Sequence, residues 1–300
     1  MKKILIAYYT QSGQIKEILD QYMSAFKEDE NYQIFHHQIK PVQDFPFPWS
    51  DESFFDVFPQ AVAESGCELQ AMPQELIQDY DLIIIGLQVW YLSPSIPVTA
   101  FLQSNDFKSI AKDTSVITIN GCRNMWFMAH RSIRNYLSTA KAKYKAHIVL
   151  FDKANNLLSV VSIMYWAYTG KKEKKWGIFP KPGISDADIV GSKKYGEILK
   201  EYWEDNRIDD VQREYISKGG VLVYPHLMSM EHKAKRIFKI WTKFILRNEK
   251  QRRFKLQLFK YYLMFMIYLL SPIATFVFYI TYPLFYKRIR KNIDFYQGLS

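Results

Sequence analysis

The chain has 300 residues, of which 48% are hydrophobic and 23% charged, so it can fold around a sizeable core and is not intrinsically disordered. Two cysteines exclude a disulfide scaffold and a cysteine-based zinc cluster. The net charge of +10 is unevenly distributed: residues 231–300 carry 15 Lys and Arg against 3 acids, and the remainder carries 25 against 27. A net positive charge confined to an apolar tail favours a membrane surface over nucleic acid as partner.

Alternating strands and helices are predicted over the first two thirds of the chain. Five strands are predicted, at 4–9, 31–39, 81–86, 114–120 and 146–151, and the first of them is a continuous apolar run, as expected for a strand buried on both faces. Helical patterns follow the first strand and recur at about 97–104, 123–140 and 186–204; Ser185, three residues before Asp188, is the predicted cap of the last. This alternation predicts an α/β fold with a doubly wound parallel sheet and helices on both faces.

The first loop of interest lies between the first strand and the first helix. It combines two hydroxyl side chains, a glycine and the backbone N–H groups of a helix start, in the order Thr10, Gln11, Ser12, Gly13 and Gln14. Such a loop forms a phosphate cradle, and it lies at the edge where parallel sheets carry their chemistry.

Two further loops follow the third and fourth strands and therefore reach the same edge. The first carries Trp90 and Tyr91, whose rings suit stacking against a flat ligand. The second consists of Gly121, Cys122, Arg123 and Asn124, and is followed by Trp126, a third candidate ring contact. A phosphate loop with two ring-facing loops predicts an FMN site.

Two residues near these loops are candidate catalytic groups. Arg123 can stabilise an enolate or the reduced flavin with its fixed positive charge. His130, in the following helix, is a candidate acid or base. Core packing is the alternative for Trp90 and Trp126, and an ordinary surface position is the alternative for His130. No group of residues predicts a metal site.

The first 205 residues resemble the flavodoxin-like superfamily, whose phosphate loop has the form T/S-x-T/S-G-x-T. The resemblance implies a five-stranded parallel sheet in the order 2-1-3-4-5 and FMN as the cofactor. It implies phosphate binding by residues 10–14, and ring contacts by Trp90, Tyr91 and residues 121–124. Ile15 departs from the pattern, because the superfamily has a hydroxyl residue there.

The aromatic tail and the segment KGGVLVYPHLMSMEHKAKRI, at 218–237, are similar to the bacterial dialkylresorcinol-condensing enzymes of flexirubin-type pigment clusters. That resemblance implies flavin-dependent aromatisation of a dialkyl-cyclohexane-1,3-dione, with a ketosynthase as pathway partner. An NAD(P)H-dependent quinone or flavin reductase, and a membrane-docked flavodoxin-like electron carrier, remain alternatives.

Beyond the FMN-binding domain, predicted over 1–205, the chain divides into a connector at 206–230 and a tail. Within that domain, residues 153–184 form an insertion that leaves from the site edge, either as a lid over the flavin or as an ordinary packed helix. Residues 231–260 predict a basic amphipathic helix, and 261–300 a hydrophobic membrane anchor. Removing residues 231–300 is expected to leave a soluble flavin-binding body.

Residues 261–286 are uncharged and would form a helix of about 39 Å, sufficient for one tilted span. Lys and Arg flank both ends, and Ser271 with Pro272 divides the run, which favours a re-entrant or interfacial hairpin over a single span. A buried pair of soluble helices is the third reading. No signal peptide is expected. We therefore expect a peripheral or monotopic enzyme on the cytoplasmic side of the inner membrane, with lipid and a lipophilic small molecule as partners.

Overall fold

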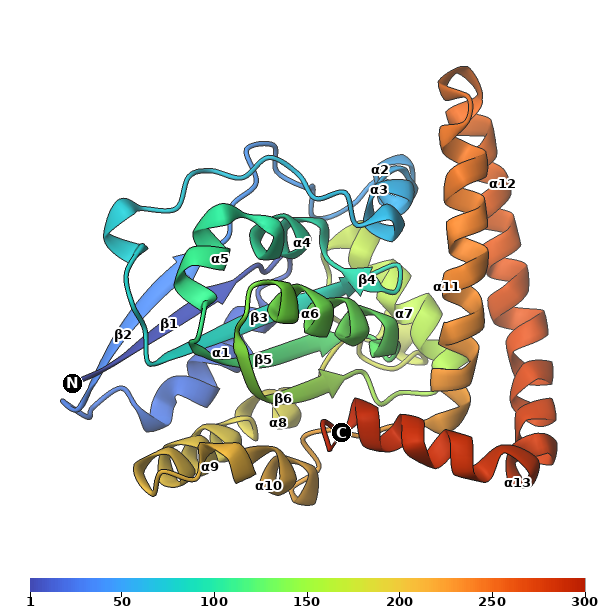
Figure 1. The fold of residues 1–300 in the computed structure, drawn as a ribbon. Coiled ribbons are helices and arrows are strands. Elements are labelled where there is room, and N and C mark those ends of the chain that lie inside the picture. The colour runs from blue at the N-terminus through green and yellow to red at the C-terminus, as the bar shows by residue number, and fades with distance from the viewer. Residues whose placement is uncertain (300) are drawn as a thin grey trace.

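Five parallel strands form the central sheet of the computed structural model, which describes residues 1–299 (Figure 1). The strands are β1 (Lys2–Tyr8), β2 (Tyr32–Gln38), β3 (Leu82–Trp90), β5 (Ser115–Cys122) and β6 (Lys143–Phe151). Their order is β2-β1-β3-β5-β6, which confirms the predicted order 2-1-3-4-5 and the flavodoxin-like fold. The sequence did not predict β4 (Ser93–Pro94), a two-residue strand antiparallel to β3.

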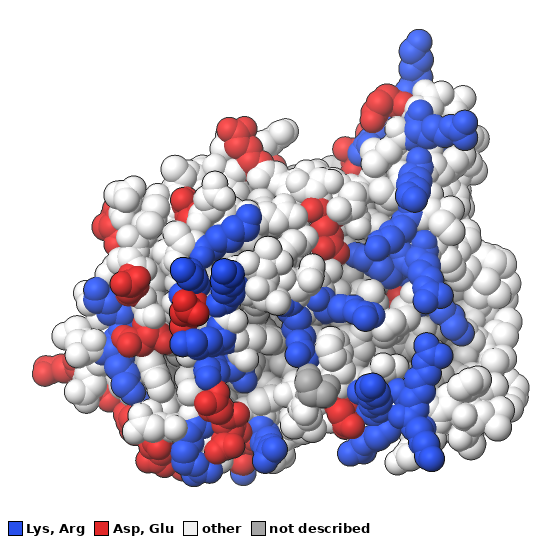
Figure 2. Space-filling view, viewed as in Figure 1, with Lys and Arg blue, Asp and Glu red and all other residues white. Residues whose placement is uncertain are grey.

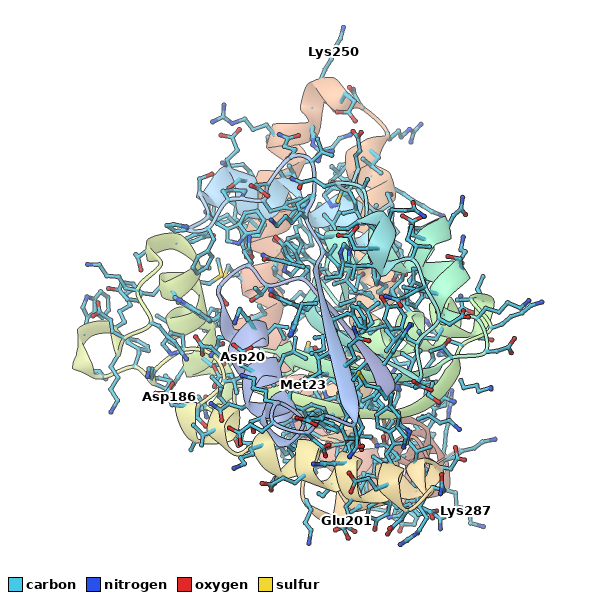
Figure 3. All side chains as sticks on the ribbon, turned by 90° about the vertical axis from the view of Figure 1, so that its left-hand side faces the viewer. Asp20, Met23, Asp186, Glu201, Lys250 and Lys287 are labelled. Atoms are coloured by element: carbon cyan, nitrogen blue, oxygen red, sulfur yellow. The ribbon has the colours of Figure 1, made fainter. Side chains whose placement is uncertain are left out.

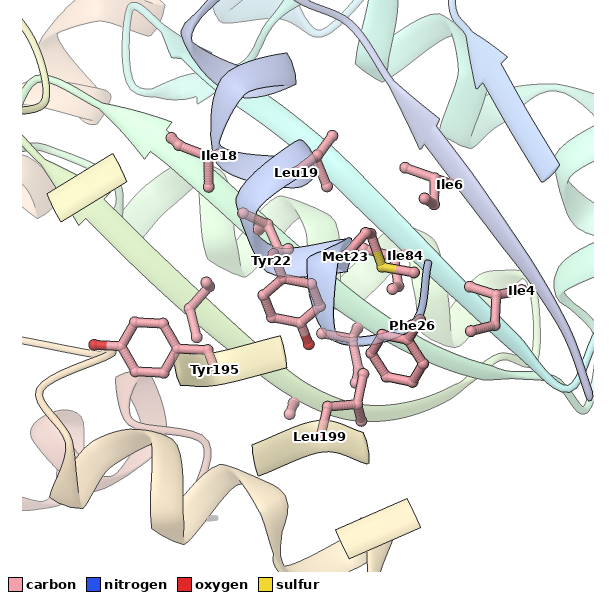
Figure 4. Close-up of a cluster of buried hydrophobic side chains, with 14 of the residues drawn as sticks. Ile4, Ile6, Ile18, Leu19, Tyr22, Met23, Phe26, Ile84, Tyr195 and Leu199 are labelled. Atoms are coloured by element: carbon pink, nitrogen blue, oxygen red, sulfur yellow. The ribbon is translucent and has the colours of Figure 1, made fainter. Parts of the chain in front are cut away.

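One face of the sheet is covered by helices from both ends of the body. These are α1 (Gln14–Tyr22), α8 (Asp186–Val190), α9 (Lys193–Glu204) and α10 (Val211–Ser217), with the short 3-10 turns η1 (Met23–Ala25) and η4 (Ile208–Asp210). Figure 4 shows the apolar cluster beneath them, where Tyr22 and Phe26 pack between Ile4 of β1 and Leu199 of α9. The strands are apolar on both faces because helices cover both faces.

The opposite face is covered by α4 (Ile96–Gln103), α5 (Asn105–Ala111) and α6 (Phe127–Thr139). Phe101, Phe107 and Leu137 are buried there against Leu5 and Ile83. The predicted helices at 97–104 and 123–140 correspond to α4 and α6. The predicted helix at 186–204 is interrupted between α8 and α9, and Ser185 caps α8 by accepting from the N–H of Asp188 at 3.1 Å.

Two segments, one between β2 and β3 and one after β6, carry additional helices. After β2 come α2 (Asp51–Asp56), α3 (Phe58–Ala63) and η2 (Gln74–Leu76), and the insertion after β6 folds into α7 (Asn156–Thr169) and η3 (Lys175–Gly177). No prediction covered α2 or α3, because each has only six residues, too few for a clear helical periodicity.

The C-terminal extension begins with a helical hairpin rather than the single amphipathic helix predicted at 231–260. Its first arm is α11 (Pro225–Leu246); the chain then reverses through η5 (Glu249–Gln251) and returns as α12 (Arg252–Phe265). Lys250 marks the tip, which projects beyond the body in Figure 3. The prediction was wrong because the apolar periodicity of the sequence continues across the turn and hides it. In the structure the first helix ends before Asn248, whose side chain accepts from the N–H of Lys250.

A break in the helix was predicted at Ser271 and Pro272, but the structure has none. The helix continues from α12 through the π-helical turn η6 (Met266–Leu270) into α13 (Ser271–Tyr296). Proline lacks an N–H and its ring crowds the carbonyl one turn earlier. The wider π turn immediately before Pro272 accommodates both effects, so the chain passes through without reversing.

The extension also packs into the body rather than forming a separate appendage. Phe238 of α11 and Phe259 of α12 are buried against Phe58 of α3, and the rings of Phe58 and Phe259 stack at 3.7 Å. At the other end, Tyr296 of α13 is 1% exposed and packs against Trp126. Deleting residues 231–300 would therefore expose these two apolar clusters, contrary to the expectation of a soluble body.

The helix over residues 249–296 is long and apolar enough to cross a membrane. Its most apolar stretch of 18 residues has a mean hydropathy of 2.1, and no part of that stretch is buried. Both ends of the uncharged run nevertheless contact the same body. Lys260 pairs with Asp51 at 2.7 Å, and the carbonyl of Tyr296 lies 3.0 Å from His147 Nε2. A single span with its flanks on opposite sides is incompatible with these contacts.

Candidate functional site

A cavity of about 280 Å³ lies at the carboxyl end of the sheet, beside the parallel neighbours β1 and β3. At this point the order of strands reverses, because β2 lies on one side of β1 and all later strands lie on the other. We call this cavity the switch-point cavity. It is lined by all three predicted loops, by the segment before and within α2, by α7 and by residues 183–184.

The first loop positions backbone N–H groups at the start of α1. Gly13 has φ +89°, a left-handed conformation that favours glycine, and its N–H donates to Thr10 Oγ1 at 3.1 Å. Among the described residues, no side chain caps α1. The first-turn N–H groups of α1 therefore have no side-chain partner, and Ser12, Gln14 and Ile15 line the cavity beside them. Phosphate binding by this loop stays a prediction.

The side chains of this loop act differently from the prediction. The Gln11 amide donates to the carbonyl of Pro46 at 2.9 Å and accepts from Trp49 Nε1 at 3.2 Å. The Gln14 amide donates to the carbonyl of Ile184 at 3.0 Å and accepts from its N–H at 3.3 Å. Both glutamines thus clamp neighbouring loops in place, which leaves Ser12 and the backbone to face a ligand.

The second loop is a tight turn between β3 and β4. Tyr91 and Leu92 have φ of +47° and +64°, as a two-residue hairpin of this handedness requires. Trp90 and Tyr91 both line the cavity, and the Tyr91 hydroxyl donates to the carbonyl of Phe54 at 2.7 Å. Burial raises the pKa of Tyr91 well above its usual range, so the hydroxyl stays protonated and serves as an anchor.

The third loop fixes a cation at the cavity wall. The Arg123 guanidinium donates to Asn156 Oδ1 at 2.8 Å and to Ser159 Oγ at 3.2 Å, both on α7. Burial lowers its pKa to about 10, so it remains charged at neutral pH. A Cβ at Gly121 would lie 2.6 Å from Ile15 Cδ1, so a larger residue there would require the Ile15 side chain to move. Burial also raises the pKa of the Cys122 thiol well above its usual range, which leaves it unreactive.

His130 and Trp126 do not reach the switch-point cavity. Trp126 is 1% exposed and packs against Phe127 and Tyr296. His130 is 2% exposed, with its ring 4.2 Å from that of His147 under α6. Burial lowers the pKa of His130 well below its usual range. Both are core residues in this structure, so the catalytic role predicted for His130 and the ring contact predicted for Trp126 have no geometric support.

Gln88 was not among the predicted site residues. It lines the cavity from β3, and its Nε2 is buried without a hydrogen-bond partner in residues 1–299. A buried unsatisfied donor costs free energy, so it points to a ligand acceptor. Its position at the end of an apolar strand was the available signal, because a polar residue there faces the site edge.

An aromatic wall was also missed. Phe47, Trp49 and Phe54 line the cavity, and the Trp49 and Trp90 rings meet edge-on at 5.5 Å. The run FPFPW at 45–49 was the sequence signal, since alternating proline and aromatic residues indicate a rigid, apolar loop. From the insertion, Trp166 of α7 also lines the cavity, and its ring meets that of Phe47 edge-on at 5.9 Å.

A second cavity, of about 380 Å³, adjoins the first. We call it the helical chamber. Val89, Tyr91 and Arg123 line both spaces, and α11, α12, η6 and α13 supply most of the remaining wall. Within residues 1–299, no group of three His, Cys, Asp or Glu side chains is arranged to hold a metal ion.

No protein-family model and no curated protein matches the chain. Among solved structures, a flavoprotein in complex with FMN from Lactobacillus acidophilus NCFM is similar over 50% of this chain and 91% of its own, with 20% identity and a TM-score of 0.36. An NAD(P)H:quinone oxidoreductase from Methanothermobacter marburgensis is similar over 58% and 98%, with 8% identity and a TM-score of 0.28. At such identities and scores, no property of either protein is transferred to this chain.

Proposed function

We propose that this chain is an FMN-dependent oxidoreductase acting on a lipophilic ring substrate. The observation that carries the proposal is the buried, unpaired Nε2 of Gln88 inside an aromatic cavity beside the uncapped start of α1. These features fit FMN: the α1 N–H groups would hold the phosphate, Trp90 and Trp49 would contact the flavin ring, and Gln88 would donate to a ring acceptor.

Bound FMN would supply a two-electron acceptor. The chain supplies positioning and electrostatics through Arg123, which lines both cavities and is held rigid by Asn156 and Ser159. A fixed cation in a partly desolvated wall stabilises negative charge as it develops on a substrate oxygen. It would therefore favour the enolate of a cyclic ketone at the junction of the cavities.

For the substrate, we propose a dialkyl-cyclohexane-1,3-dione that is aromatised to a dialkylresorcinol. The ring loses two hydrogens, one as a hydride to the acceptor and one as a proton, and the enol tautomer of the product is the aromatic diol. The similarity of residues 218–237 to dialkylresorcinol-condensing enzymes and the apolar chamber beside Arg123 support this choice. A ketosynthase that makes the dione is the corresponding pathway partner.

We also propose that the enzyme rests on a membrane without crossing it. Exposed apolar side chains recur every three or four residues along α12, η6 and α13, and we call them the apolar stripe: Phe254, Leu258, Tyr261, Phe265, Leu269, Ile273, Phe276, Ile280 and Leu284. Figure 2 shows an uncharged surface at the right-hand edge, along α12, beside a column of Lys and Arg near α11, and further basic residues over the C-terminal part of α13. Such a face inserts into the lipid interface while the cations contact anionic headgroups, here on the cytoplasmic side.

An anaerobic reaction separates the candidate activities. FMN-loaded protein is mixed with a dialkyl-cyclohexane-1,3-dione or with NADPH, and flavin absorbance and resorcinol release are followed. We expect the dione to bleach the flavin and to release one resorcinol per flavin. Bleaching by NADPH alone would instead assign a quinone or flavin reductase, and bleaching by neither would leave the electron carrier.

A further inference from the structure

The helical chamber is more than an extension of the switch-point cavity, because a different part of the chain builds it. Leu263, Met266 and Ile267 line it from one side, and Ala234 and Ile237 of α11 line it from the other. The walls are therefore predominantly aliphatic. An apolar cavity of about 380 Å³ is large enough for a ligand.

The chamber wall also holds polar side chains: Lys233 of α11, Ser271 of α13 and a hydrogen-bonded group at the junction with the switch-point cavity. Arg123, Asn124 and Asn156 line it where it meets the switch-point cavity. Asn124 is 5% exposed; its Nδ2 donates to Asn156 Oδ1 at 2.7 Å, while its Oδ1 is buried with no hydrogen-bond partner in the part of the chain that is described. An unpaired buried acceptor next to a fixed cation calls for a ligand group that both donates and accepts, as a hydroxyl or enol does.

The opposite end lies against the helix that carries the apolar stripe. Met266 and Ile267 face the chamber, whereas Leu269 and Ile273 on the same helix are each 53% exposed. One helix thus separates the chamber from the surface proposed to meet lipid. A ligand dissolved in the bilayer would have only this single layer of side chains to pass.

We propose that the helical chamber holds the hydrocarbon chain of a membrane-dissolved amphiphile, with its hydroxyl or enol head hydrogen-bonded at Asn124 and Arg123. The proposal rests on the proposed function and names its substrate class. The head then lies at the junction with the switch-point cavity, and the chain extends between α11 and α12. Head and chain make separable contributions, which gives the test two independent readouts.

The test uses the full-length protein, with and without FMN, and 4-alkylresorcinols from ethyl to octyl as probes. Affinity is measured by isothermal titration calorimetry below the micellar concentration of each probe. We expect each added methylene to strengthen binding roughly fourfold, until the chamber is full. Affinity independent of chain length would overturn the proposal.

A matched pair of substitutions locates the chain. Ile267→Trp fills the chamber and is expected to abolish the dependence on chain length, whereas Ile273→Trp, the same change on the exposed face, is expected to preserve it. If Ile267→Trp fails to fold, Ala234→Leu narrows the chamber from α11 and carries the same expectation. An unchanged dependence in the folded chamber variant would overturn the proposal.

Asn124→Leu tests the head. It removes the unpaired acceptor, so it is expected to weaken every probe by about tenfold while leaving the chain-length dependence intact. If wild type and Asn124→Leu bind the probes with equal affinity, the polar head of the ligand does not hydrogen-bond to Asn124. If probe affinity depends on chain length but the protein does not bind FMN, the chamber proposal stands and the flavin proposal fails. If the protein binds FMN but probe affinity does not depend on chain length, only the chamber proposal fails.

Discussion

Lys235 and Glu64 lie 171 positions apart in the chain, and the Lys235 ammonium is 3.0 Å from Glu64 Oε1. The same ammonium donates to Ser93 Oγ and, at 3.3 Å, to the carbonyl of Leu92. A cation from α11 therefore fixes the β3–β4 turn that places Tyr91 on the cavity wall. The C-terminal extension is in this way part of the site's architecture.

Glu64→Gln is expected to destabilise the protein by about 3 kcal/mol, because it leaves Lys235 as a mostly buried cation without its counter-charge. Thermal unfolding measures the change. The control is Asp20→Asn, which removes the exposed partner of Lys16 and is expected to cost less than about 1 kcal/mol. Equal losses for the two variants would contradict a structural role for the Lys235 pair.

Glu231 predicts an unusual dependence of stability on pH. It is fully buried and accepts from the N–H groups of Phe127 and Met128, at 3.2 Å and 2.7 Å, and burial raises its pKa to about 8. Between pH 4.5 and 8 the folded state keeps a proton that the unfolded state has released. The contribution of Glu231 to the free energy of unfolding therefore decreases as pH rises through this window.

Glu231→Gln retains an acceptor for the two N–H groups and removes the titration. We expect wild type to lose stability relative to Glu231→Gln between pH 5 and about 8, and the difference to stay constant at higher pH. Urea unfolding at several pH values measures it. A difference that does not change with pH would show that Glu231 has the same pKa in both states.

Gln88→Leu separates ligand binding from folding. Removing an unpaired buried donor is expected to leave the FMN-free protein as stable as wild type or more so, and to weaken FMN binding by about tenfold. Thermal unfolding and flavin fluorescence give the two quantities. A loss of stability with unchanged FMN affinity would place the Gln88 amide outside the flavin site.

The apolar stripe predicts binding to anionic vesicles. Phe276→Ser combined with Ile280→Ser removes two large exposed side chains, so vesicle affinity is expected to fall by at least tenfold. Val42→Ser with Val190→Ser, a pair of comparably exposed residues on the body, is the control and is expected to bind as wild type does. Co-sedimentation with vesicles measures both, and equal losses would place the membrane contact elsewhere.

The sequence was sufficient where a single local pattern determines the outcome. Short strand-like segments alternating with helical patterns identified the five parallel strands, and the glycine-containing loop after the first strand identified the start of α1. Trp90, Tyr91 and Arg123 were placed correctly at the cavity because strand ends of a parallel sheet share one edge.

The predictions failed where tertiary packing decides. Trp126 follows a site loop, but burial against Tyr296 draws it into the core, and Tyr296 comes from an extension whose return to the body no local pattern reveals. Pro272 suggested a reversal, but a π turn accommodated it. The helical chamber exists only because α11 and α12 pack against each other and the body, so periodicity could not have indicated it.

The most direct test of the central claim is a titration of the purified full-length chain with FMN, followed by flavin fluorescence, with riboflavin as comparison. We expect saturable quenching with one FMN per chain. We expect riboflavin to bind more weakly, because it lacks the phosphate that the α1 N–H groups would hold. Unquenched FMN in excess protein, or equal affinity for FMN and riboflavin, would contradict the assignment of the switch-point cavity.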